Sequence, residues 1–283
     1  MRAMVSVGHI VNPVRAGAGS DLQAAQPVTF ETMRRARDFS RARVDVELLT
    51  TQYPDETDLV PSGFSSAGDL TRSALDCGPF RAPRRLPLLG EIVDRLAGSS
   101  RADLLVYTNV DIALQPYFYD TVARLVALGH DAFAVNRRTI PEGGVIPDRL
   151  PFLYARLGEP HPGWDCFVFR RELAARIKLG SILIGTGWMG RTLIANFACL
   201  AAGFTVFTDL HATFHIGNQQ SWKSELLSDY LAHNRREAGT ILAELERVHG
   251  PFDPGGFPAR FKRQLERQER RARTASGTQE KLP

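Results

Sequence analysis

Short apolar runs recur along the chain, and most are bounded by proline, glycine or charged residues. Runs of this length between turn residues are typical of strands in a buried sheet. Several segments between them repeat apolar residues at intervals of three and four, which predicts helices with one buried face. The expected strands are 4–11, 44–48, 104–107, 132–135, 166–169 and 204–207, and the expected helices are 29–39, 86–97, 118–128, 171–179, 192–202 and 221–248.

Strands that alternate with helices predict an α/β fold, with a mostly parallel sheet flanked by helices in a single domain over residues 1–250. Thr29 stands where a helix cap is expected, and Gly129 follows a helix. The stretches 52–84 and 142–162 are rich in proline and glycine and have no clear period. We therefore expect two long loops, the first of them on the surface.

Residues 251–283 follow a proline-rich break and are predicted to form a basic C-terminal helix or a disordered tail. Eight basic and three acidic residues lie from Arg260 onward, which gives this segment a charge of +5. Because the whole chain has a net charge of +4, the remaining residues together carry −1. Such a run is usually a solvated helix face, and contact with an anionic membrane is a second option. Because the body is nearly neutral, the pI of about 9.1 does not indicate nucleic-acid binding.

Composition excludes several classes of protein. With 43% hydrophobic and 23% charged residues, the chain has the composition of a soluble globular protein. Its three cysteines show no CxxC spacing, so neither a disulfide framework nor a zinc site is expected. The longest apolar region, 193–207, is interrupted and shorter than the roughly 20 residues of a membrane span. Because the start of the chain suits a strand better than a signal peptide, we expect a cytoplasmic protein.

The most informative stretch is Asn109-Val110-Asp111, which comes at the end of the apolar run 104–107. Ligands of open α/β sheets collect beyond the carboxyl ends of the strands. An aspartate in that place can hold a divalent cation through oxygen, and the cation can neutralise a diphosphate. Asp111 also fits a purely structural role, as a cap of the helix 118–128 or as a turn residue.

Three further polar clusters lie at expected strand ends or in the loops beside them. They are Trp164-Asp165, the glycine-rich stretch 185–190, and 209–218, which includes His215. Because such strand ends converge on one edge of a sheet, we expect these clusters to share a site with Asp111. The stretch 185–190 is not a P-loop, since no Gly-Lys-Ser/Thr follows it, and it suits a tight turn or a close approach to a ligand.

The order of these motifs resembles that of the GT-A glycosyltransferase superfamily, whose enzymes move a sugar from a nucleotide diphosphate. The likeness covers residues 4–222, and Asn109-Val110-Asp111 resembles the superfamily's DxD motif with Asn in the first place. The resemblance implies a GT-A-like, Rossmann-like sheet and a glycosyltransferase that uses a UDP- or GDP-sugar as donor and Mn²⁺ or Mg²⁺ as cofactor. The acceptor is not identified.

The resemblance also implies roles for individual residues. The second acid of the motif normally binds the metal, and His215 stands where many of these enzymes place a further ligand; carboxylate, imidazole and water together suit manganese. Arg84 or Arg85 could contact phosphate, and the two tryptophans could stack on a sugar or serve only as core aromatics. The predicted residues are Asp111 and His215 for the metal, Asn12, Arg85, Asn109, Asp111, Trp164 and Trp188 for the donor, and Asp165 for catalysis.

Asp165 is expected to contact sugar hydroxyls or to act as general base on the acceptor hydroxyl. Inverting members of the superfamily usually keep an acid near the start of the helix that follows the glycine-rich stretch. This chain has Gly187-Trp188-Met189-Gly190 there. The missing acid moves the role of base to Asp165 and leaves the inverting and retaining routes both open.

Two other functions fit the same residues. A nucleotidyltransferase on a related fold would carry an early glycine-rich loop with a basic residue. The stretch 15–19, with one arginine and two glycines, resembles such a loop only weakly. A nucleotide-sugar-binding protein without catalysis would fit the altered DxD motif and the missing acid. Turnover distinguishes the last option, because a binding protein would not release nucleoside diphosphate.

Overall fold

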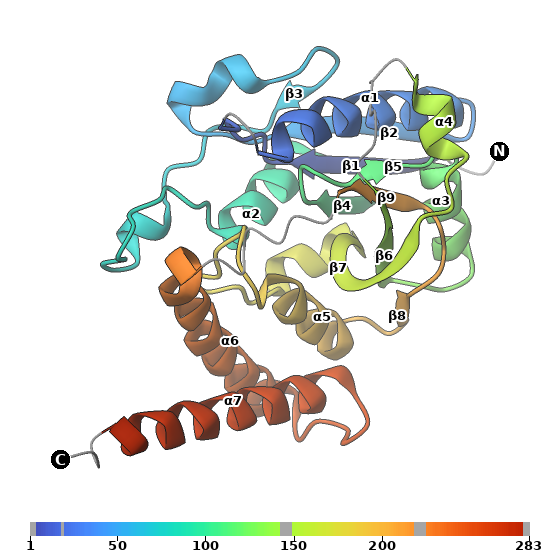
Figure 1. Cartoon of the computed structure of the whole chain (residues 1–283). Helices are drawn as coiled ribbons and strands as arrows, with labels where there is room; N and C mark the ends of the chain where they lie inside the picture. Colours follow the sequence, from blue (N-terminus) through green and yellow to red (C-terminus); the bar gives the residue numbers. More distant parts are fainter. Residues whose placement is uncertain (1–3, 18–19, 142–148, 218–224, 280–283) are drawn as a thin grey trace.

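The protein is described by a computed structural model that covers residues 4–17, 20–141, 149–217 and 225–279. It is an α/β structure in which helices cover both faces of one curved sheet (Figure 1). Within the described residues the strands are β1 (Val5–Val11), β2 (Val44–Thr50), β3 (Ser65–Ser66), β4 (Leu104–Thr108), β5 (Ala113–Leu114), β6 (Ala132–Ile140), β7 (Glu159–Arg170), β8 (Phe204–Phe207) and β9 (Thr213–Ile216). The α-helices are α1 (Leu22–Ser40), α2 (Leu89–Ser99), α3 (Phe118–Ala127), α4 (Leu150–Tyr154), α5 (Met189–Leu200), α6 (Ser228–His249) and α7 (Phe257–Gln279).

The sheet is mixed but mainly parallel, which confirms the predicted fold class. Its order is β3-β2-β1-β4-β7-β6-β9-β5, and β8 also pairs with β6. Among the described strands, five of the eight pairs are parallel, and the antiparallel ones join β7 to β4, β7 to β6, and β5 to β9. This order places β4, with the Asn109-Val110-Asp111 motif at its end, near the middle of the sheet.

Strand β4 is buried along its whole length because both faces of the sheet are covered. Successive side chains of a strand point to opposite faces. Accordingly, Leu104 and Val106 pack into one core with α1 and α3, while Leu105 and Tyr107 pack into the other with α2, α5 and α6. The two cores fix the strand from both sides and so fix the direction in which its polar end leaves the sheet.

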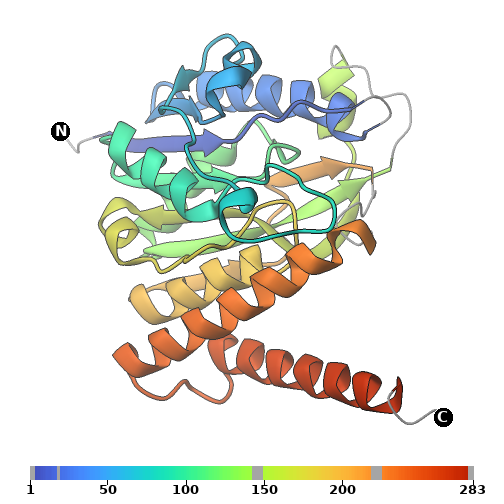
Figure 2. The same ribbon diagram turned by 90° about the vertical axis from the view of Figure 1, so that its left-hand side faces the viewer.

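The C-terminal helices pack against the body beside α5, as Figure 2 shows. Helix α7 contributes the buried residues Ala259, Phe261 and Leu265. The predicted charged helix is therefore present over Phe257–Gln279, and its first half is part of the core. The domain boundary at residue 250 stays a prediction. No helix in the described part of the chain is long and apolar enough to span a bilayer.

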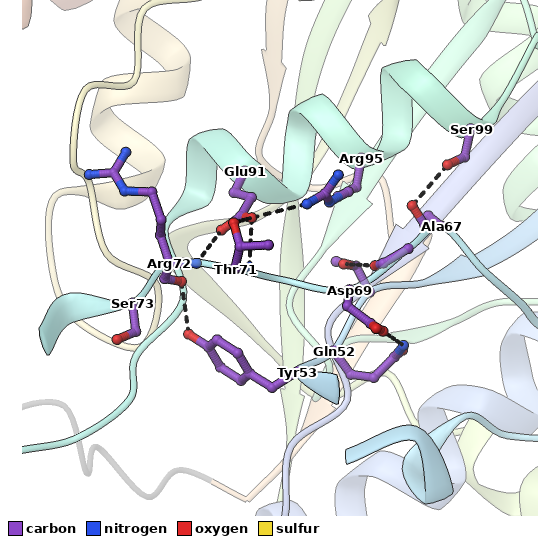
Figure 3. A network of polar contacts seen from close by, with 12 residues as sticks. Gln52, Tyr53, Ala67, Asp69, Thr71, Arg72, Ser73, Glu91, Arg95 and Ser99 are labelled. Atoms are coloured by element: carbon purple, nitrogen blue, oxygen red, sulfur yellow. Dashed lines mark hydrogen bonds and ion pairs between the residues drawn. The ribbon is translucent and has the colours of Figure 1, made fainter. Parts of the chain in front are cut away.

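The first long loop is irregular as predicted, but it does not lie wholly on the surface. Tyr53, Leu70 and Ala74 are buried in the core. Figure 3 shows how the segment is fastened to α2: the carboxylate of Glu91 accepts hydrogen bonds from the backbone N–H of Thr71 at 2.8 Å and of Arg72 at 3.1 Å. The Tyr53 hydroxyl donates to the carbonyl of Arg72 at 3.1 Å. Backbone groups without a sheet partner are thus satisfied by side chains.

Several predicted boundaries are wrong. Helix α1 begins at Leu22, so Thr29 is a buried residue inside the helix and Pro27 also lies within it. Packing of Ala25 and Val28 outweighs the lost backbone donor of that proline. The expected helix 171–179 is a six-residue 3₁₀ turn, Arg171–Arg176.

The second predicted loop, 142–162, contains α4 and the start of β7, and its part 142–148 lies outside the described residues. The short strands β3, β5 and β9 carry too few residues for a period to show, and the sequence did not predict them. The expected start of the long helix near residue 221 also lies outside the described residues, and α6 itself begins at Ser228.

Candidate active site

A cavity of about 780 Å³ opens beyond the ends of β1 and β4. Residues from many separate parts of the chain line it, and each predicted polar cluster contributes at least one, His215 for the cluster 209–218, so the predicted clusters come together. The lining residues include Asn12 after β1, Asn109 and Asp111 after β4, Trp164 and Asp165 of β7, the stretch 184–191, and Arg235, Gln264 and Gln268 of the C-terminal helices. The volume lies within the range of ligand sites, roughly 300–1,000 Å³.

Asp111 and His215 form the pair at the centre of this site. Asp111 lies three residues beyond β4, and His215 lies in β9 opposite Thr139 of β6. Their Oδ2 and Nε2 atoms are 3.1 Å apart, and the other ring nitrogen of His215 is 2.9 Å from the carbonyl oxygen of Gly217. A carbonyl only accepts, so Nδ1 carries a hydrogen and Nε2 faces the carboxylate.

Burial and charge oppose each other in this pair. Burial favours the neutral form of each group, but the mutual hydrogen bond and attraction outweigh it. The pKa of Asp111 is therefore lowered and the pKa of His215 is raised from their ordinary values.

The same two atoms fit a divalent cation. The second oxygen of Asp111, Oδ1, is buried without a hydrogen-bond partner in the described part of the chain. Oδ2 of Asp111 and Nε2 of His215, which lie 3.1 Å apart, would be the ligand atoms for such an ion. Metal-binding histidines also usually donate their other ring N–H to a carbonyl or carboxylate, as His215 does to Gly217.

The protein supplies few ligands for such an ion. No group of three or more His, Cys, Asp or Glu side chains with metal-binding geometry occurs among the described residues. Mg²⁺ is commonly held by one or two carboxylates together with substrate phosphates and water. Asp111 and His215 would therefore hold Mn²⁺ or Mg²⁺ together with oxygens of a bound substrate.

Asp165 is tied into a second network beside this pair. Its Oδ1 accepts a hydrogen bond from the Asn109 side chain at 3.1 Å, and its Oδ2 forms an ion pair with Arg137. The Asn109 side-chain oxygen accepts from the Tyr107 hydroxyl at 3.0 Å. Asn109 is thus a bridge within the protein, and both oxygens of Asp165 are engaged. The catalytic role of Asp165 stays a prediction.

Arg137 is a site residue that the sequence did not single out. It lines the cavity, and its positive charge contributes to the lowered pKa of Asp111 and partly opposes the rise in the pKa of His215. Strand β6 runs to Ile140 rather than ending near Val135, and irregular pairing with β7 around Asn136 lets Arg137 reach Asp165. The only signal was the pair Arg137-Arg138, which Asn136 separates from the end of the apolar run 132–135.

Asn12 and Arg85 both line the cavity as predicted. The Asn12 side chain donates to the carbonyl of Thr51 at 2.7 Å, and its oxygen is buried without a partner in the described chain. Arg85 pairs with Asp55 at 2.7 Å and with Glu56 at 3.3 Å, and its guanidinium lies 4.1 Å from the Tyr53 ring centre. Its charge is therefore already compensated at the rim.

Trp164 and Trp188 line the same cavity, next to α5. Trp188 occupies the N-cap position of α5 with φ of 79° and is buried, and Trp164 packs on Phe257 and Phe261 of α7. A bulky residue with positive φ is strained and is typical of functional sites. Arg191 joins the two, with its guanidinium 5.2 Å from the Trp188 ring and 5.9 Å from the Trp164 ring.

The residues thus define an α/β protein with a cavity suited to a metal ion and an anionic ligand. No protein-family model and no curated protein matches the chain. Among solved structures, it is similar to residues 1–349 of S. aureus TarS in complex with UDP-GlcNAc, at 11% identity over 86% of this chain and 70% of that one, with a TM-score of 0.47.

It is also similar to glucosyl-3-phosphoglycerate synthase from Mycobacterium tuberculosis in complex with Mn²⁺, UDP and phosphoglyceric acid. The identity is 18% over 89% of this chain and 81% of that one, and the TM-score is 0.46. Because both TM-scores are below 0.5, these likenesses carry no weight for activity, which has to be argued from the site itself.

Proposed function

We propose that this protein is a metal-dependent glycosyltransferase, which moves a sugar from a UDP- or GDP-sugar to an acceptor hydroxyl. The observation that carries the proposal is the Asp111–His215 pair. Two ligand atoms lie 3.1 Å apart beside a buried, unpartnered carboxylate oxygen, at the end of the central strand. This is the place and the chemistry that a nucleoside diphosphate with a bound cation requires.

The cavity has room for a donor on one side of this pair. Asn12 lines it on the side of β1 and suits the nucleoside, because its side-chain oxygen is buried without a partner in the described chain. The leaving diphosphate develops negative charge, and a bound divalent cation stabilises that charge as a Lewis acid.

Arg137 adds a positive charge to the cavity beside Asp111 and His215. Its ion pair with Asp165 holds the guanidinium in place, and its Nε is buried without a partner in the described residues. Charge-assisted hydrogen bonds to phosphate are among the strongest that a side chain makes. We therefore assign Arg137 to the donor diphosphate.

Asp165 serves first to orient Arg137 and Asn109. To act as general base in an inverting reaction, it would exchange the hydrogen bond from Asn109 for one from the acceptor hydroxyl. A retaining reaction by front-face attack needs no such exchange. The first turn of α5 contains no acid that could take the role instead.

The test is calorimetric titration of UDP into the protein with Mn²⁺ or with EDTA. Wild type should bind UDP only with the metal, and Asp111→Asn should lose more than about tenfold in affinity, since even outer-shell changes at metal sites cost 10–100-fold. The matched control is Asp131→Asn, whose partner Arg170 lies away from the cavity. Equal, metal-dependent binding by Asp111→Asn would refute the metal site.

A further inference from the structure

The arginines that line the cavity fall into two groups. Arg15, Arg85 and Arg137 form ion pairs with nearby aspartates. Arg84, Arg191 and Arg235 also line the cavity but form no ion pair with any described acidic residue. Of these three, Arg191 lies in α5 and Arg235 in α6, the helices beside one wall. A partly buried guanidinium without an anion carries a desolvation cost that a bound anion removes.

Arg191 is held in place by neutral groups. Its Nε donates to the side-chain oxygen of Gln264 in α7 at 3.2 Å, and the rings of Trp188 and Trp164 flank its guanidinium. Burial lowers its pKa. The side chain is thus positioned, while its charge is left without a counterion.

Arg235 is positioned by its neighbour on α6. The side chain of Asn234 bonds the backbone of Leu183, accepting from its N–H and donating to its carbonyl, both at 2.9 Å. It also donates to the carbonyl of Gly187 at 2.9 Å. These bonds fix α6 against the loop before α5, and the Nε of Arg235 is buried there without a partner in the described chain.

The beginning of α5 adds backbone donors at the same wall. The first hydrogen bond of the helix runs from Thr192 N–H to the carbonyl of Trp188 at 3.0 Å, so the N–H groups of residues 189–191 have no intrahelical partner. No side chain caps this end and its first turn contains no acid. A helix N-terminus in this state favours an anion.

An independent observation at this wall also points to a ligand. Thr186 is only 7% exposed, its hydroxyl has no hydrogen-bond partner among the described residues, and it lines the cavity. A buried hydroxyl without a partner is costly unless a ligand satisfies it. Thr186 lies two residues before the helix cap.

We propose that Arg191, Arg235, Thr186 and the N-terminus of α5 bind an anionic group, phosphate or carboxylate, carried by the acceptor. This inference rests on the proposed glycosyltransferase function, which requires an acceptor. Helix α5 packs on β6 and β7, whereas Asn12 follows β1, on the other side of β4 in the sheet. The anion site therefore lies on the side of Asp111 away from the nucleoside.

The experiment titrates inorganic phosphate, and separately acetate, into the protein saturated with UDP and Mn²⁺, with ionic strength held constant by chloride. Because UDP and Mn²⁺ already occupy the donor site, the titration measures binding of the added anion to the proposed site at the N-terminus of α5. Phosphate or acetate should bind wild type about tenfold or more tightly than Arg235→Gln, since a hydrogen bond to a charged group is lost. The matched control, Arg236→Gln, changes an exposed neighbour outside the cavity and should bind like wild type.

If phosphate binds more tightly than acetate, the acceptor is assigned a phosphate group. If acetate binds more tightly, the acceptor is assigned a carboxylate. Should Arg235→Gln not fold, as judged by circular dichroism, Arg191→Gln gives the same test. Equal binding by wild type and variant, or none of either anion, would overturn the inference. Metal-dependent UDP binding by wild type and by the variant is measured beforehand in separate titrations. Loss of the anion with UDP binding intact overturns only this inference, whereas absence of UDP binding in wild type counts against the proposed function.

Discussion

Lowering the pH below 6.5 should destabilise the fold through His9, a buried residue that contacts the end of β4. His9 lies fully buried in β1, with its two ring nitrogens 2.9 Å from the hydroxyl oxygens of Tyr119 and Thr108. Thr108 is the last residue of β4, directly before the Asn109-Val110-Asp111 motif. Both neighbours are neutral, so nothing compensates a charge on the ring.

Burial lowers the pKa of His9 from 6.5 to about 3. The unfolded chain therefore takes up a proton between these pH values and the folded chain does not. The contribution to stability is complete above about pH 6.5 and is lost as the pH falls toward 3. The whole difference corresponds to about 5 kcal/mol, and the part lost by pH 5 to about 2 kcal/mol, at about 1.4 kcal/mol per pH unit.

The assay is urea unfolding of wild type and His9→Gln at pH 7.5 and at pH 5. Glutamine is a polar residue with a donor and an acceptor that does not titrate, and the other titrating groups are common to both proteins. Wild type should lose about 2 kcal/mol more than the variant between the two pH values. Equal losses would refute the reasoning, because the buried ring would then not be kept neutral by the fold.

Three further predictions concern the cavity walls. Arg137→Met should weaken metal-dependent UDP binding by about tenfold or more, since a charge-assisted hydrogen bond contributes 1.5–3 kcal/mol, and calorimetry that showed no change would contradict its role. Arg85→Met should change the same affinity by less than about threefold, because Asp55 and Glu56 already pair with it at the exposed rim, and a larger loss would show direct phosphate contact. Gly190→Ala should lower the unfolding free energy by about 1–3 kcal/mol in a thermal melt, because the added carbon would lie 2.8 Å from the backbone oxygen of Trp164. The control Gly98→Ala, with open space around it in α2, should not destabilise, and equal effects of the two changes would contradict the packing described.

The sequence was most informative where one local pattern had one physical solution. The apolar run of β4 predicted a strand buried on both faces with Asp111 beyond its end, and the structure places that strand near the middle of the sheet. Trp188 and His215 were expected at the same edge because strand ends of an α/β sheet meet there. Asp165 also lies at this edge, but because β7 runs antiparallel to β4 and pairs Cys166 with Thr108.

Other features depended on contacts that no local pattern records. The length of β6, and with it the position of Arg137, is set by pairing with β7 and β9 beyond the apolar run. The packing of α6 and α7 on α5, which brings Arg235 into the cavity, depends on which neighbour an amphipathic face meets. Helix α1 starts early because tertiary packing overrides a proline and a better cap.

The most direct test of the central proposal is a screen of UDP-, GDP-, ADP- and dTDP-sugars that follows release of nucleoside diphosphate without acceptor, with Mn²⁺ or with EDTA. We predict slow release from one donor that requires the metal and is lost in Asp111→Asn. Release from no donor, or release that EDTA and the Asp111 variant leave unchanged, would contradict the assignment of this cavity to metal-dependent sugar transfer.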